Sequence, residues 1–76
     1  MTMELYLNGE RYHWMVADGH SGQHTPTLSD LIEHLELQGR RVAVEVNGVL
    51  VPRTQHDQQP LQVGDRVEIV QAIGGG

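Results

Sequence analysis

The chain ends on three glycines, Gly74 to Gly76, and its last atoms are an α-carboxylate that is ionised at neutral pH. Because glycine has no Cβ and adopts almost any backbone geometry, such a segment can enter a channel too narrow for other residues. Fully extended, Ile73 to Gly76 spans roughly 13 Å. Such a segment could place its carbonyl group against a reactive centre. The alternative is an ordinary frayed terminus.

The composition restricts the classes of function. The 76 residues suffice for one small domain, and the absence of cysteine rules out a disulfide or a thiolate metal site. The net charge is −5, with five arginines and no lysine, which disfavours nucleic acid as a partner because phosphates repel an acidic surface. No apolar run is long enough to span a membrane. We therefore expect a soluble, cytoplasmic protein that binds neither nucleic acid nor membrane.

No set of residues indicates catalysis on this chain. We find no phosphate-binding glycine loop and no nucleophile with a matching base, so we expect no catalytic residue and no bound cofactor. His20 and His24 lie four residues apart with His13 nearby, a spacing that can bind zinc on a helix. Their segment is polar and contains glycine and proline, which indicates a loop. We therefore expect no metal site.

The first half of the chain predicts a hairpin followed by a helix. Residues 3–7 and 10–16 have the patterns of strands, and Asn8-Gly9 between them suits a type I′ turn. Thr27 is placed as the N-cap of a helix, and Gly39 is placed as the C′ residue that ends it. The helix carries one apolar stripe, formed by Leu28, Leu31, Ile32 and Leu35.

The second half predicts a further hairpin and a last strand. Residues 42–46 form the clearest strand, and Asn47-Gly48 makes another tight turn. Residues 49–51 form a short strand that Pro52 ends, which suits a sheet edge. Residues 56–60 are polar and irregular. Asp65 is expected to shape the turn before the strand at residues 66–71.

One helix with one apolar stripe needs one sheet face to cover, which predicts a two-layer α+β domain. We expect a β-grasp (ubiquitin-like) roll, with a mixed sheet of four to five strands covered by one main helix and the last strand parallel to the first. The predicted domain spans residues 1–72, and residues 73–76 form a flexible glycine tail. If Val67 and Ile69 face the helix, Val70 faces outward. Val70, Ala72 and Ile73 are then candidates for a partner-docking surface beside the tail.

Several segments together resemble the ThiS family of ubiquitin-like sulfur carriers of thiamine biosynthesis. They are Leu7-Asn8-Gly9-Glu10, Thr27-Leu28-Ser29-Asp30-Leu31, Val46-Asn47-Gly48, Val51-Pro52-Arg53, Gly64-Asp65-Arg66-Val67-Glu68-Ile69 and Ala72-Ile73-Gly74-Gly75-Gly76. The likeness covers nearly the whole chain, and the combination is more specific than any one segment. Residues 17–26 depart from the family's pattern, because this connection is longer and richer in histidine.

The resemblance implies a protein co-substrate and not an enzyme. An E1-like, ThiF-type adenylyltransferase would use ATP and magnesium to adenylate the terminal carboxylate. Sulfur from a cysteine persulfide, supplied by a cysteine desulfurase or another donor, would convert it to a thiocarboxylate for a ThiG-type thiazole synthase. Gly76 would carry the adenylate and then the sulfur, while Gly75 and Gly74 would pass through the narrow entry of the partner's active site.

Three alternatives to this interpretation remain open from the sequence. The nearest is the sulfur-carrying small subunit of molybdopterin synthase, which uses the same terminal chemistry. The second is a passive β-grasp binding module whose glycine tail is incidental. The third is an enzyme, which the lack of a convergent catalytic set disfavours.

Overall fold

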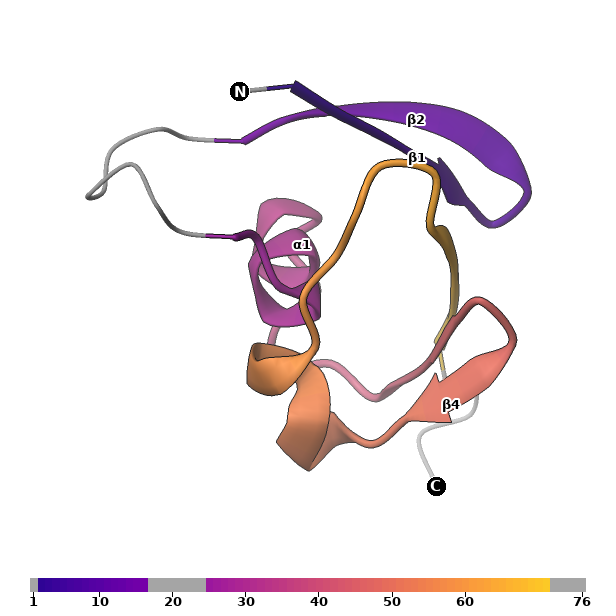
Figure 1. Ribbon diagram of the computed structural model, residues 1–76. Helices are drawn as coiled ribbons and strands as arrows, with labels where there is room; N and C mark the ends of the chain where they lie inside the picture. The colour runs from indigo at the N-terminus through magenta and orange to yellow at the C-terminus, as the bar shows by residue number, and fades with distance from the viewer. Residues whose placement is uncertain (1, 17–24, 72–76) are drawn as a thin grey trace.

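The computed structural model describes residues 2–16 and 25–71, which form a sheet and two helical segments (Figure 1). In chain order the elements are β1 (Thr2–Leu7), β2 (Glu10–Met15), α1 (Leu28–His34), β3 (Val42–Val46), β4 (Val49–Val51), the 3-10 helix η1 (Arg53–Gln58) and β5 (Arg66–Gln71). The predicted boundary between domain and tail falls after the last described residue and stays a prediction.

The five strands form one mixed sheet in the order β2-β1-β5-β3-β4. The first and last strands pair in parallel at its centre, with Tyr6 opposite Arg66 and Leu7 opposite Val67. All other neighbours are antiparallel. This arrangement confirms the predicted α+β class and the β-grasp roll. The predicted parallel pairing of the first strand of the chain with the last is confirmed as well. It also confirms that β4 is an edge strand.

The core lies between one face of the sheet and α1. Leu5, Val44 and Val67 on three neighbouring strands are fully buried, and they pack with Leu28 and Leu31 of the helix. Burying one such side chain stabilises the fold by about 1.5–3 kcal/mol. Twelve buried hydrophobic residues make up the core: Met3, Leu5, Trp14, Leu28, Leu31, Ile32, Val44, Val46, Val51, Leu61, Val67 and Ile69. The helical stripe was predicted correctly, although Leu35 is only partly buried.

Helix α1 starts where predicted but ends earlier than expected. At its N-terminus, the Asp30 N–H donates to Thr27 Oγ1, and the Thr27 N–H donates to Asp30 Oδ2. The helix ends at His34, and Glu36, not Gly39, is the residue after the cap with positive φ, at 61°. The Leu37 N–H donates to the Ile32 carbonyl at 2.9 Å, which closes the last turn.

Gly39 serves a separate turn after the helix. Its φ is +80°, and the turn is closed by the Arg40 N–H, which donates to the Leu37 carbonyl at 3.0 Å. The prediction that Gly39 ends the helix was therefore wrong, although its positive φ is required. A glycine in the sequence indicates a residue with positive φ, but it does not indicate which of two consecutive turns contains that residue.

Residues 56–60 were expected to be irregular, and this prediction was wrong for the first part of the segment. Residues 53–58 form η1, which follows Pro52 directly. His56 is only 8% exposed, and its Nε2 donates to the Val51 carbonyl at 3.1 Å. This bond ties η1 to the edge strand β4. Short 3-10 segments have little apolar periodicity, so the sequence pattern did not indicate it.

Two asparagines in the hairpin turns hold the last strand. Asn8 and Asn47 have φ of 51° and 53°, as the Asn-Gly turns predict. Asn8 Oδ1 accepts from the Ile69 N–H at 2.8 Å, and Asn47 Oδ1 accepts from the Arg66 N–H at 2.9 Å. Asn47 Nδ2 also donates to Asp65 Oδ1 at 3.0 Å. The side chain of each asparagine therefore accepts one hydrogen bond from the backbone of β5.

Asp65 shapes the turn before β5, as predicted. Its Oδ2 accepts from the Gln62 N–H at 2.8 Å, and its backbone N–H donates to the Gln62 carbonyl at 3.0 Å. With its second carboxylate oxygen bound to Asn47, the side chain connects this turn to the hairpin between β3 and β4. The hydrogen bonds of Asp65 to Gln62 and to Asn47 therefore fix the residue at which β5 begins.

Replacing Asn47 by Asp removes the amide donor and places a second carboxylate against Asp65. We expect Asn47→Asp to lower the free energy of unfolding by about 1 kcal/mol more than Asn8→Asp does. Asn8 is the matched control because its turn geometry is the same, and it also accepts from a β5 N–H. Urea unfolding at neutral and acidic pH measures both variants. The difference should shrink at acidic pH, because the repulsion requires two ionised carboxylates. Equal losses for the two variants at neutral pH would contradict the assigned network.

Candidate functional site at the end of strand β5

The predicted reactive tail leaves from the central strand of the sheet. Gln71, the last described residue, is still paired with Val42 of β3. Gly74, Gly75 and Gly76, together with Ala72 and Ile73, lie outside the described residues. The structure therefore places the base of the tail and leaves its reactive end a prediction. The base is held by the best-buried part of the sheet, because Val67 and Ile69 of the same strand belong to the core.

The last part of β5 is open on one side. The parallel pairing with β1 covers Arg66 and Val67 only, and β1 ends at Leu7. The Asn8 side chain continues the ladder as far as Ile69. Beyond that point β5 keeps β3 as its one neighbour among the described strands. An enzyme can therefore approach the base of the tail from this side without displacing a strand.

The outer face of the sheet presents an apolar and acidic surface beside this point. Val70 is 64% exposed and pairs with Ala43, which confirms that it faces outward. Leu50 is 62% exposed and pairs with Glu45 on the same face. We name this surface the outer patch; it consists of Ala43, Glu45, Leu50, Glu68 and Val70.

The outer patch contains one unfavourable contact. Glu45 lies directly opposite Glu68 on adjacent strands, and both are exposed. Like charges in directly opposed positions destabilise a sheet. A partner that brings a cation to this pair would remove the repulsion. The contact therefore fits a surface that is completed by another protein.

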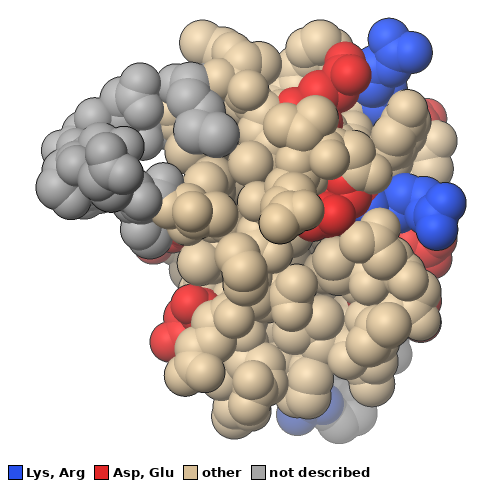
Figure 2. All heavy atoms as spheres, viewed as in Figure 1, with Lys and Arg blue, Asp and Glu red and all other residues tan. Residues whose placement is uncertain are grey.

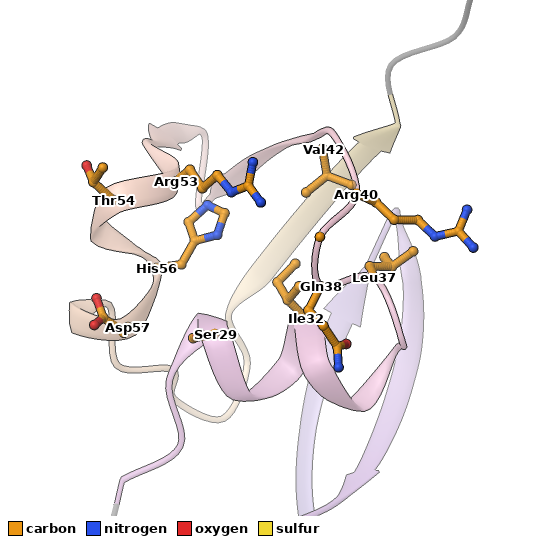
Figure 3. A pocket seen from close by; sticks show the side chains of 11 residues that line it. Ser29, Ile32, Leu37, Gln38, Arg40, Val42, Arg53, Thr54, His56 and Asp57 are labelled. Atoms are coloured by element: carbon orange, nitrogen blue, oxygen red, sulfur yellow. The ribbon is translucent and has the colours of Figure 1, made fainter. Parts of the chain in front are cut away.

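Cationic side chains line two cavities at the same strand end. Arg41 and Arg53 line a cavity of about 360 Å³ together with Val70. Arg53 also lines a second cavity, of about 340 Å³, with Arg40 and His56 (Figure 3). Acidic and basic surfaces therefore flank Val70. The sequence analysis did not predict that these arginines lie close together. The predicted hairpin could have indicated it, because the residue before β3 and the residues after β4 come close together when the two strands pair antiparallel.

The histidines of the described residues make separate contacts and do not form a metal site. In residues 2–16 and 25–71 no group of three or more His, Asp or Glu side chains could hold a metal ion. His13 lies 2.8 Å from Glu4, whereas His20 and His24 fall outside the described residues. His34 is hydrogen-bonded to the Tyr12 hydroxyl at 2.8 Å and lies against Trp14.

Charge is spread thinly over the face that carries α1 and η1. Figure 2 shows this face as largely uncharged, with acidic side chains scattered over it and cationic ones only at its margins. Among the described residues, no helix is both long and apolar enough to cross a membrane. At the end of β5, the exposed Val70 and Glu68 lie near the arginines that line the cavities.

Comparison with known proteins identifies the family. A sequence model of the ThiS family matches residues 5–76. The sulfur carrier protein ThiS of Bacillus subtilis is 31% identical over 72 residues, which cover 95% of this chain and 98% of that protein. A protein of Paramagnetospirillum magneticum named thiazole synthase is 35% identical over 74 residues, which are 97% of this chain but 20% of that protein. The chain therefore spans about a fifth of the length of that relative.

Solved structures agree with the sequence comparison. The crystal structure of the thiamine biosynthesis protein ThiS from Geobacter metallireducens matches with a TM-score of 0.70 and 31% identity, covering 97% of this chain and 100% of that one. The family match extends over nearly the whole chain, and the β-grasp topology is the same. These findings show that the chain belongs to the ThiS family.

Proposed function

We propose that this protein is the sulfur carrier of a thiamine biosynthesis pathway, and that the carrier group forms on its C-terminal carboxylate. A partner enzyme adenylates the Gly76 carboxylate with release of pyrophosphate. The outer sulfur of a persulfide then displaces AMP to give an acyl disulfide, and a thiol reduces its S–S bond to free the thiocarboxylate, which donates its sulfur for thiazole formation. The observation that supports this proposal most is the position of β5. The strand carries the base of the tail to an end of the sheet where β3 is its one neighbour among the described strands.

The terminal chemistry explains why the tail needs a partner. A carboxylate is a poor electrophile, and ATP with magnesium supplies AMP as a good leaving group on the carbonyl carbon. A glycyl carbonyl leaves the path of attack free of side chains. Because this chain contains no cysteine, a persulfide cannot form on it, and the sulfur comes from a donor outside this chain. A cysteine desulfurase or another persulfide donor fills that role.

The expected partners are a ThiF-type adenylyltransferase and a ThiG-type thiazole synthase. The relatives named thiazole synthase support the second, because a region similar to this chain makes up 20% of each of them. Linking a carrier to its acceptor enzyme in one chain raises their effective concentration. We propose that the separate protein meets the same kind of enzyme by diffusion.

We further propose that the outer patch docks on the adenylyltransferase. Val70 and Leu50 supply exposed apolar area next to the base of the tail, and Glu45 with Glu68 supplies a negative charge that a basic partner surface would complete. Complementary charge increases the rate of encounter and fixes orientation. The same contact would place the tail at the entry of the active site.

Changing the terminus should abolish the activity without affecting the fold. We expect both Gly76→Ala and the addition of one alanine after Gly76 to abolish ATP-dependent adenylation, measured as pyrophosphate exchange with the ThiF-type enzyme. The melting temperature should stay unchanged, because Gly76 lies beyond the last strand. An alanine added before Met1 is the control and should have no effect. A passive binding module would give no pyrophosphate exchange with any of these proteins, including the unaltered one.

A charge at Val70 should weaken docking. We expect Val70→Asp to raise the KM of the adenylyltransferase for this protein roughly tenfold, because a carboxylate would have to be desolvated in the contact. Val63→Asp is the matched control: Val63 is 68% exposed, against 64% for Val70, and it precedes the opposite end of β5. Both variants should unfold at the same urea concentration as the unaltered protein. Equal KM values for the two variants would exclude Val70 from the docking surface.

A further inference from the structure

The two cavities beside the end of β5 adjoin one another. Both are lined by Val42 and Arg53, and together they run from the C-terminal end of α1 to Val70. We name this feature the arginine groove. Its apolar lining residues are Ile32, Leu37, Val42 and Ala43, and Arg40, Arg41 and Arg53 line it as well. Figure 3 draws the Arg40 guanidinium pointing away from Arg53. Volumes of about 340 and 360 Å³ are large enough for several side chains of a partner.

Three of the five arginines of an otherwise acidic chain gather along this groove. Within the described part of the chain, Arg40 and Arg53 form no ion pair and no side-chain hydrogen bond, whereas Arg11 lies 3.9 Å from Glu4. Figure 3 shows the Arg53 guanidinium and the His56 ring on the side of η1 that faces Ile32 and Val42. Asp57 also lines this cavity, but its carboxylate is drawn on the far side of η1. Arg40 and Arg53 therefore carry positive charge that no carboxylate among the described residues pairs with.

The base of Arg53 is held in place by the fold. Arg53 opens η1, and the buried His56 ring in the same turn donates to the Val51 carbonyl. Pro52 restricts the backbone immediately before it. An arginine on a rigid backbone loses less conformational entropy when its side chain binds a ligand. Its planar guanidinium can also donate two parallel hydrogen bonds to a carboxylate. These features are typical of a recognition residue.

We propose that the arginine groove binds an extended segment of the activating enzyme in which carboxylate side chains alternate with apolar ones. The carboxylates would pair with Arg53 and Arg40, and the apolar side chains would pack on Val42 and Ile32. The inference rests on the proposed function and adds the chemistry of the partner to it. The groove is continuous with the outer patch through Val70, which lines one of the two cavities. A single partner can therefore occupy both surfaces.

The two surfaces together define one orientation of the partner. The outer patch is negative at Glu45 and Glu68, and the groove is positive at Arg40 and Arg53, with Val70 between them. A partner with basic and acidic surfaces in the matching order can dock in one direction only, because the reverse orientation brings like charges together. Docking in that direction points the chain beyond Gln71 toward a fixed place on the enzyme.

Charge reversal at the groove tests this inference. We expect Arg53→Glu to raise the KM of the adenylyltransferase for this protein at least roughly tenfold, and Arg40→Glu/Arg53→Glu to raise it further. The kcat should stay the same, because the tail is unaltered. Arg53→Lys should restore part of the loss, since it keeps the charge but not the bidentate geometry. Arg66→Glu is the matched control: it makes the same charge change at the opposite end of β5 and should leave KM within about twofold.

The outcomes separate this inference from the proposed function. If the KM of Arg40→Glu/Arg53→Glu is unchanged and adenylation still depends on Gly76, the arginine groove is not a docking site. The proposed carrier function would then remain supported. Saturable binding of inorganic phosphate at Arg53 in NMR titration, with KM unchanged by Arg53→Glu, would identify a small-anion site instead and would also overturn it. If the unaltered protein is not adenylated, both proposals fail.

Discussion

The parallel pairing of β1 with β5 is the constraint on which the rest of the structure depends. It places the last strand of the chain at the centre of the sheet, between the N-terminal hairpin and the hairpin formed by β3 and β4. Leu5 and Val67, on the two paired strands, are both fully buried. Because the pairing is short, the Asn8 side chain extends it by one position and holds Ile69. The strand that ends at the site is thus fixed by residues from both ends of the domain.

The shortness of this pairing also creates the site. If β1 continued beside β5, the base of the tail would lie between two strands and would be accessible from the sheet faces alone. Instead, Val70 and Gln71 have β3 as their one neighbour among the described strands. The outer patch lies on the outer face of this segment, and the arginine groove shares Ala43 and Val70 with it. The described domain therefore holds the base of the tail where β5 has one neighbouring strand, and under the proposed function the groups that activate the terminus belong to partner enzymes.

Much of the fold could be predicted from local patterns. Period-two alternation identified the strands, the Asn-Gly pairs identified the turns, and the Thr27 cap identified the start of α1. These features depend on neighbours in sequence, and so they are visible there. The end of the helix was missed because Glu36, a residue with no preference for positive φ, takes the position expected of Gly39. The 3-10 helix was missed because its stability depends on the bond from His56 to β4, which is a tertiary contact.

The site was only partly predictable for the same reason. The outward direction of Val70 follows from the period of its own strand. The opposition of Glu45 to Glu68 requires the register between β3 and β5, and the gathering of arginines requires the path of the chain around β4 and η1. The resemblance to the ThiS family supplied the terminal chemistry, which no local pattern contains. The structure adds the surfaces that would present this chemistry.

The central claim is that the terminal carboxyl group of this protein carries the sulfur. Intact-mass measurement of the protein after incubation with a ThiF-type adenylyltransferase, ATP, magnesium, a persulfide donor and a thiol reductant tests this most directly. The account predicts the mass gain of one oxygen atom replaced by sulfur, located by fragmentation at Gly76. An unchanged mass, or sulfur located at any other residue, would contradict it.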